Sequence, residues 1–220
     1  MKKFLCVFAL LGLFLCAHSA FAGPGSEEFI QLCAQGTAQE VEAAIKTGVN
    51  LKAASGQSMS PLTTAAVFNR NPQVIYVLVQ YGAQVNAKDN DGWTALMHAA
   101  CFRQNPEALS ILIKHGANMN IGDDEGWTPL MVAALNNNPA GISILIKSGA
   151  AVNAENQAGR TALIIAARSC KNPEVVQALL QGGADTRLRD KQGMTAIGYA
   201  VNNEYLQNTE ACRQLAEADR

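Results

Sequence analysis

The sequence contains few of the residues that perform catalysis or hold metal ions. It has only three histidines, and the two outside the N-terminal segment, His98 and His115, have no cysteine or carboxylate at the spacing of a zinc site. It also lacks a Gly-x-Ser-x-Gly motif, a glycine loop that would hold phosphate, and a Cys–His pair. The acidic run 123–125 is expected at the tip of a turn, where no pocket would tune it for acid–base catalysis. These absences predict a protein with no catalytic activity, no cofactor and no metal.

A strong charge of either sign is also missing. The net charge is −1, and residues 1–22 hold two lysines and no acid, so the 15 basic and 18 acidic side chains that follow give −3. Nucleic-acid binding requires a basic face that neutralises phosphates, and electrostatic attachment to an anionic membrane requires a basic cluster. The composition therefore predicts neither kind of partner.

A long apolar run occurs once, at the N-terminus. Lys2 and Lys3 precede the apolar residues 4–17, and Ala20-Phe21-Ala22 places small residues at the two positions that a signal peptidase reads. The run is shorter than the roughly 20 apolar residues of a membrane-spanning helix, although a membrane anchor is the alternative. We expect residues 1–22 to be a cleaved signal peptide, and the remainder to have no stable membrane anchor. The absence of an Asn-x-Ser/Thr sequon favours a bacterial periplasm, with secretion the broader possibility.

What the sequence has in abundance is one repeated motif. Gly92-Trp93-Thr94-Ala95-Leu96-Met97-His98-Ala99-Ala100 is one copy, and the copies begin at residues 59, 92, 126, 159 and 193, a spacing of 33 or 34 residues. Repetition at a fixed period of this length predicts a solenoid of stacked units.

Each unit is expected to hold two helices and a projecting turn. Thr94 begins a short first helix whose paired Ala99 and Ala100 let neighbouring units approach closely. Asn105-Pro106 suits the N-cap and first position of a second helix, and Gly116 suits its left-handed end. Asp91-Gly92 predicts the turn of a hairpin between units.

The repeated Asp-x-x-Gly-x-Thr-Pro-Leu-x-x-Ala-Ala, followed by Leu-Ile-Lys-x-Gly-Ala-x-Val-Asn, resembles the ankyrin repeat. The resemblance covers essentially all of residues 23–220. It implies an all-α solenoid of stacked helix-turn-helix units with projecting β-hairpin loops. About six units are expected: 26–56, 57–90, 91–123, 124–156, 157–190 and 191–220, of which the first and last are atypical end units.

The chain departs from the family motif in two ways. Proline remains only as Pro61 and Pro129. The family's histidine after the leucine, which normally ties neighbouring units by hydrogen bonds, is replaced in every copy, by Thr63, Met97, Met131, Ile164 and Gly198. We therefore expect the units to be joined more by apolar contact.

Four cysteines lie beyond residue 22: Cys33, Cys101, Cys170 and Cys212. An exported protein would meet an oxidising compartment, where disulfides persist. The four fall in different units, and a disulfide needs Cα atoms within about 7 Å. We expect reduced structural cysteines, with a Cys170–Cys212 disulfide as the open alternative.

The resemblance implies that hairpin tips and the exposed ends of the first helices line a concave face that contacts the partner. Projected by position, the candidate residues are Phe68, Asn90, Asp91, Trp93, Phe102, Arg103, Asp124, Glu125, Trp127, Asn136, Asn137, Arg160, Arg168 and Ser169. Trp93 and Trp127 occupy the same position in neighbouring units and either anchor a partner or cover the adjacent hairpin. The tips are acidic in the middle of the array and basic later, a polarity that could orient a partner.

The predicted function is therefore a non-catalytic protein–protein interaction module of the periplasm, monomeric until bound. Its role would be that of a scaffold or accessory factor for an exported enzyme. Secreted bacterial proteins of the family include examples that support a partner enzyme. The alternatives are an immunity-type inhibitor of a secreted toxin and, less favoured, an enzyme in its own right.

Overall fold

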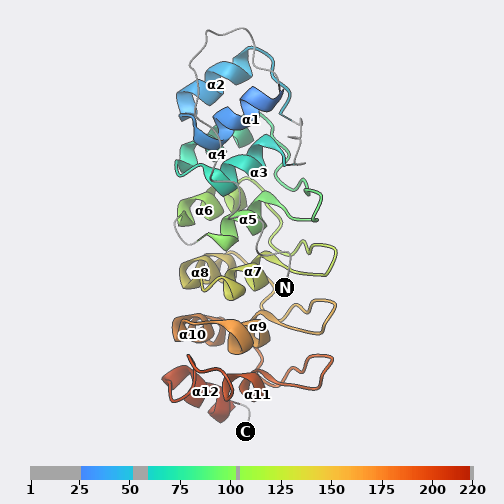
Figure 1. Cartoon of the computed structure of the whole chain (residues 1–220), viewed down its shortest axis with the longest axis vertical. Helices are drawn as coiled ribbons and strands as arrows, with labels where there is room; N and C mark the ends of the chain where they lie inside the picture. Colours follow the sequence, from blue (N-terminus) through green and yellow to red (C-terminus); the bar gives the residue numbers. More distant parts are fainter. Residues whose placement is uncertain (1–25, 52–58, 103–104, 219–220) are drawn as a thin grey trace.

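In a computed structural model of the chain, the structure describes residues 26–51, 59–102 and 105–218. The expected signal peptide, residues 1–22, lies outside the described residues, as does Arg103. Twelve helices occupy the described part, and they stack as successive pairs along one axis (Figure 1). The six pairs are α1 (Ser26–Gln35) with α2 (Ala38–Lys46), α3 (Pro61–Phe68) with α4 (Pro72–Gln80), α5 (Ala95–Cys101) with α6 (Pro106–Lys114), α7 (Pro129–Leu135) with α8 (Pro139–Lys147), α9 (Ala162–Ser169) with α10 (Pro173–Gln181), and α11 (Ala196–Ala200) with α12 (Glu210–Ala218).

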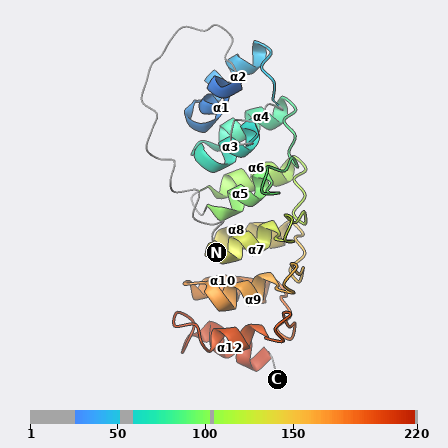
Figure 2. The same cartoon turned by 45° about the vertical axis from the view of Figure 1, so that its right-hand side comes forward.

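The first helices form one column and the second helices another. Each first helix packs against the first helix of the next unit, from α1 to α11, and the second helices do the same from α2 to α12. The turned view shows the two columns as layers of the same stack (Figure 2). This arrangement is the predicted all-α solenoid.

A single apolar core runs through the whole stack. The alanine pairs of the first helices are buried, as in Ala99 and Ala100 of α5. Leu109 and Leu112 of α6 have no exposed surface, as the apolar stripe of the second helix predicts. Because each unit buries its apolar face only against its neighbours, the fold depends on stacking.

Helix starts and ends follow the local signals of the sequence. In α5 the Thr94 hydroxyl accepts from the Met97 N–H, and in α6 the Asn105 side chain accepts from the Ala108 N–H. Equivalent caps are Ser60, Thr128, Thr161 and Thr195 for first helices and Asn71, Asn138 and Asn172 for second helices. Gly116 follows α6 with φ +88°, a conformation that favours glycine.

The predicted hairpin loops project from the stack on the side of the first helices (Figure 1). Their β pairing is minimal, because the only bridge in the described residues joins Lys88 to Thr94. The turn is held instead by a side chain: Asp89 Oδ1 accepts the N–H groups of Asp91 (3.0 Å) and Trp93 (2.8 Å). A carboxylate that satisfies these donors removes the need for a longer strand ladder.

Asparagine side chains also tie successive units together, in addition to the apolar core that joins them. Asn86 Nδ2 donates to Gly116 O (3.0 Å) of the next unit, and Asn86 Oδ1 accepts from Asn118 N–H (2.8 Å). Asn120 and Asn153 make corresponding bonds further along. The expectation of more apolar contact rested on the histidines that the repeat lacks. The hydrogen bonds between units come instead from asparagines at other positions of the repeat.

A second set of asparagine amides reaches back to the preceding unit. Asn138 Nδ2 donates to Ala100 O (3.1 Å) and Phe102 O (3.5 Å) at the end of α5. Asn69 and Asn203 donate in the same way to the carbonyl groups that end α1 and α9. The carbonyl groups left open at these helix ends are thus satisfied inside the fold.

All four cysteines outside the N-terminal segment are free thiols, Cys33 and Cys170 buried and Cys101 and Cys212 half-buried. Burial raises the pKa of Cys33 to about 12 and that of Cys101 to about 11. The pKa of Cys170 is raised to about 11, again chiefly by burial. Such thiols stay protonated and unreactive near neutral pH.

Asn138→Ala should lower the free energy of unfolding by about 2–4 kcal/mol, because it removes both the cap of α8 and the donor to buried carbonyl groups of α5. Asn172→Ala removes the cap of α10 and one exposed bond to Glu174, but no bond to another unit, and should cost about 1 kcal/mol. Urea unfolding followed by circular dichroism measures both. Equal losses would show that the bond between units contributes nothing beyond the cap.

In protein that begins at residue 23, unfolded without reductant, a thiol reagent should titrate four groups. In the folded protein at pH 8, Cys33 and Cys170 should react far more slowly, since they are buried and protonated. Fewer than four thiols in the unfolded sample would instead indicate a disulfide, with Cys170–Cys212 the pair to examine first.

Candidate interaction surface

The candidate residues lie on two rows of the stack, the loop tips and the C-terminal ends of the first helices. Phe68, Phe102, Asn136 and Ser169 each stand eight residues after the N-cap of α3, α5, α7 and α9. Because these helices form one column, the four positions line up along it. The loops project beyond the same column (Figure 1), so the two rows border one side of the array.

The loop tips are built on one recurring side chain, which we call the turn acceptor: Asp89, Asp123, Asn156 or Asp190. Each accepts two N–H groups of its own turn through Oδ1, at 2.8–3.1 Å. The second carboxylate oxygen of each aspartate then binds a side chain. The turn acceptors therefore hold the tips rather than offering free carboxylates.

Trp93 and Arg160 occupy the same position of the repeat, two units apart, and each donates a hydrogen bond to a turn acceptor. Trp93 Nε1 donates to Asp123 Oδ2 (3.2 Å), and Arg160 Nε donates to Asp190 Oδ2 (3.3 Å), each at the next loop tip. The Trp93 ring also lies 5.1 Å from that of His98. Both side chains thus join neighbouring loop tips. For Trp93, this contact is the structural role of covering the adjacent hairpin. A further role in binding stays a prediction.

Two of the turn acceptors, Asp89 and Asp190, also bind a side chain of the first helix that follows their own turn. His98 Nε2 lies 2.7 Å from Asp89 Oδ2, and the Tyr199 hydroxyl donates to Asp190 Oδ2 at 2.6 Å. Burial by itself raises the pKa of Asp190, but hydrogen bonds from Tyr199, two backbone N–H groups and Arg160 outweigh it and hold the pKa below its ordinary value. The pKa of Asp89 is lowered in the same way, with His98 the main donor against burial. Both carboxylates are thus kept ionised, and their oxygens are hydrogen-bonded within the protein.

The remaining candidates differ in exposure. Phe68 keeps 45% of its surface exposed, and Asn90, Asp91, Asp124, Glu125, Arg168 and Ser169 are exposed as well. Phe102, Trp127, Asn136 and Asn137 are half-buried. Asn137 serves the fold, since its Oδ1 accepts from the N–H groups of Lys171 and Asn172 in the next unit.

Two aromatic residues of the last unit, Tyr199 and Tyr205, are not among the candidates predicted from the sequence. The Arg168 guanidinium lies 5.7 Å from the Tyr199 ring, and Lys171 Nζ lies 5.6 Å from that of Tyr205. The last unit lacks Asn-Pro and has a longer connection, so the repeat assigned no role to Tyr205. Tyr199 could have been identified from the sequence, because it occupies the same position of the repeat as His98.

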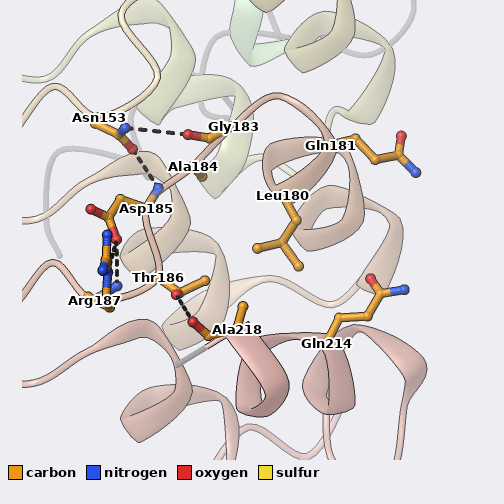
Figure 3. Close-up of a pocket in the computed structure, with 10 residues that line it drawn as sticks. All are labelled: Asn153, Leu180, Gln181, Gly183, Ala184, Asp185, Thr186, Arg187, Gln214 and Ala218. Atoms are coloured by element: carbon orange, nitrogen blue, oxygen red, sulfur yellow. Dashed lines mark hydrogen bonds and ion pairs between the residues drawn. The ribbon is translucent and has the colours of Figure 1, made fainter. Parts of the chain in front are cut away.

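An open depression of about 730 Å³ lies on the other side of the last two units, between α10, α12 and the loop 183–187 (Figure 3). Its polar groups largely bind one another: Thr186 donates to Ala218 O, Arg187 pairs with Asp185, and Asn153 bonds to Gly183 and Asp185. These contacts join the fifth unit to its neighbours, and we assign the depression no ligand.

Among the described residues, no three His, Cys, Asp or Glu side chains are grouped so as to hold a metal ion. None of the described helices has the length and apolar character needed to cross a bilayer.

Comparison with protein families gives one match. A family described as "Ankyrin repeats (3 copies)" matches residues 29–123, 62–156 and 144–220, which together span 29–220. No individual protein of curated function matches the chain significantly.

Asp190→Asn should lower the free energy of unfolding at pH 7 by about 1–3 kcal/mol, because the buried charge-assisted bonds to Tyr199 and Arg160 weaken. A carboxyl group with a lowered folded pKa stabilises the fold above its unfolded pKa of about 3.9, and this contribution is lost as the pH falls through the folded pKa. The deficit of the variant should therefore shrink below about pH 4. Urea unfolding at pH 7, 5 and 3 measures it.

Asp91→Asn is the matched control, since this side chain is an exposed tip acid in an equivalent turn. It should change stability by less than about 0.5 kcal/mol. A deficit of Asp190→Asn that is the same at all three pH values would contradict the assignment of a stabilising charge to Asp190.

Proposed function

Because the chain belongs to the ankyrin-repeat family, we propose that it binds a partner protein through the loop tips and first-helix ends. Ankyrin repeats are generally protein–protein interaction modules and are typically non-catalytic. The proposed partner is an exported enzyme, and the proposed place is the bacterial periplasm, where the protein serves as scaffold or accessory factor.

The observation that carries this proposal is Phe68. Its phenyl ring is 45% exposed at the end of α3, whereas Leu62, Ala65 and Ala66 of the same helix are buried. It stands first in the row that continues through Phe102, Asn136 and Ser169. Aromatic side chains contribute large contact area in interfaces at small entropic cost.

The rigidity of the array supports binding by a preformed surface. The asparagine bonds between units and the turn acceptors hold the tips and helix ends in place before a partner arrives. A surface that needs little ordering on binding loses less free energy to conformational entropy.

Export is supported by residues 1–22, with Lys2 and Lys3, an apolar run and Ala20-Phe21-Ala22. The raised thiol pKa values are compatible with this location. A thiol that stays protonated and buried resists oxidation in a compartment that favours disulfides.

Phe68→Ala should weaken partner binding by at least about thirtyfold if Phe68 is a binding hot spot, which corresponds to about 2 kcal/mol. Its own stability cost should be smaller than that of a buried residue, because Phe68 keeps 45% of its surface exposed. The measurement is crosslinking and pull-down from a periplasmic extract, followed by titration of the captured protein.

Tyr76→Ala provides the control, since Tyr76 is a 43% exposed aromatic residue on α4, in the other column of helices. Wild type and Tyr76→Ala should capture the same protein, and Phe68→Ala should not. Equal capture by all three folded proteins, or a loss with Tyr76→Ala alone, would rule out the proposed surface.

A further inference from the structure

The last two units carry two cations that are held in place by aromatic rings. Arg168, near the end of α9, lies over Tyr199, and Lys171, just beyond α9, lies over Tyr205. Both cations are exposed, and each stack is formed with a ring of the following unit. Val201, 53% exposed, lies between these two tyrosines in the chain. We call Arg168, Lys171, Tyr199, Val201 and Tyr205 the basic–aromatic patch.

The negative charge beneath this patch is already neutralised. Tyr199 rests on Asp190 through its hydroxyl (2.6 Å), and the Asp190 side chain has no exposed surface and pairs with Arg160. Within the described residues, neither Arg168 nor Lys171 forms an ion pair. Glu204 is exposed nearby in the chain, but its carboxylate pairs with neither cation. Two exposed positive charges therefore face solvent without a carboxylate partner.

We infer that the basic–aromatic patch binds an acidic segment of the partner protein, with carboxylates on Arg168 and Lys171 and an adjoining apolar side chain on Val201 and Tyr205. The inference rests on the proposed function and names the partner chemistry for one end of the same surface. The guanidinium of Arg168 can donate two parallel hydrogen bonds to one carboxylate. The cation–π stacks preorganise both side chains, which reduces the entropy lost on binding.

The charge of the remaining tips fixes which end of the array takes the acidic segment. The loop tip between the fifth and sixth units adds Arg189 and Lys191, both exposed, whereas Asp91, Asp124 and Glu125 make the middle tips acidic. An acidic segment is attracted to the C-terminal end and repelled from the middle. A long polyanion such as nucleic acid would be repelled by the acidic middle tips. The exposed apolar side chain of Val201 would add nothing to its binding.

The test selects phage-displayed random 12-residue peptides on the wild-type protein. Selected peptides should be enriched in Asp and Glu beside an apolar residue. Arg168→Gln/Lys171→Gln should weaken the best selected peptide at least tenfold, and the residual binding should depend less on salt. Both side chains are exposed, so thermal unfolding should be little changed.

The matched control is Lys114→Gln/Lys147→Gln, which removes two exposed lysines from the last turns of α6 and α8. It should bind as wild type does. Three outcomes overturn the inference: selected peptides with no acidic enrichment, equal weakening in the control, and a 20-nucleotide single-stranded DNA that displaces the selected peptide.

The two proposals fail separately. If Phe68→Ala loses the captured protein while Arg168→Gln/Lys171→Gln retains it at full affinity, the surface is correct and the acidic segment is wrong. If Phe68→Ala binds as wild type does, the proposed surface itself is wrong, whatever the peptides show.

Discussion

The structure depends on side-chain hydrogen bonds that satisfy the backbone of a neighbouring unit. No unit can bury its apolar face alone, and apolar contact by itself allows neighbouring units to slide. Asn138 prevents this by giving its amide to Ala100 O while its carbonyl oxygen caps α8. Asn86 does the same beside the loops, where it bonds both Gly116 and Asn118. A shift of register would leave the buried Asn138 amide and Ala100 carbonyl group unsatisfied, so this bond favours one stacking.

Side-chain hydrogen bonds to backbone groups also hold the loop tips. A short turn closed by Asp89 or Asp123 needs almost no strand pairing, and the spare carboxylate oxygen is then available to join tips. Trp93 and Arg160 each donate a hydrogen bond to this oxygen at the next loop tip. Trp93 and Arg160, both predicted from the sequence to contact a partner, are thereby engaged in the fold, and the surface proposed for recognition lies mainly at the first-helix ends.

This division of roles gives the proposed binding face a rigid frame and a few adaptable side chains. Phe68 at one end is apolar, the middle tips are acidic, and the stacked Arg168 and Lys171 make the far end basic. A partner that matches all three regions can bind in only one direction. Specificity then comes from the order of the regions along the array as much as from any single contact.

The sequence by itself determined the solenoid, through the repetition of its motif, and the ends of its helices, because caps and glycine turns act within a few residues of their own position. Thr94, Asn105 and Gly116 needed no tertiary information. It did not reveal that Asn86 and Asn138 join units, nor what Trp93 and Tyr199 contact. Trp93 and Asp123 are 30 positions apart, and Asn138 lies 38 positions from Ala100. Only the stacking of units brings such pairs together, so the tertiary structure alone decided which polar side chains hold the fold and which remain free to bind.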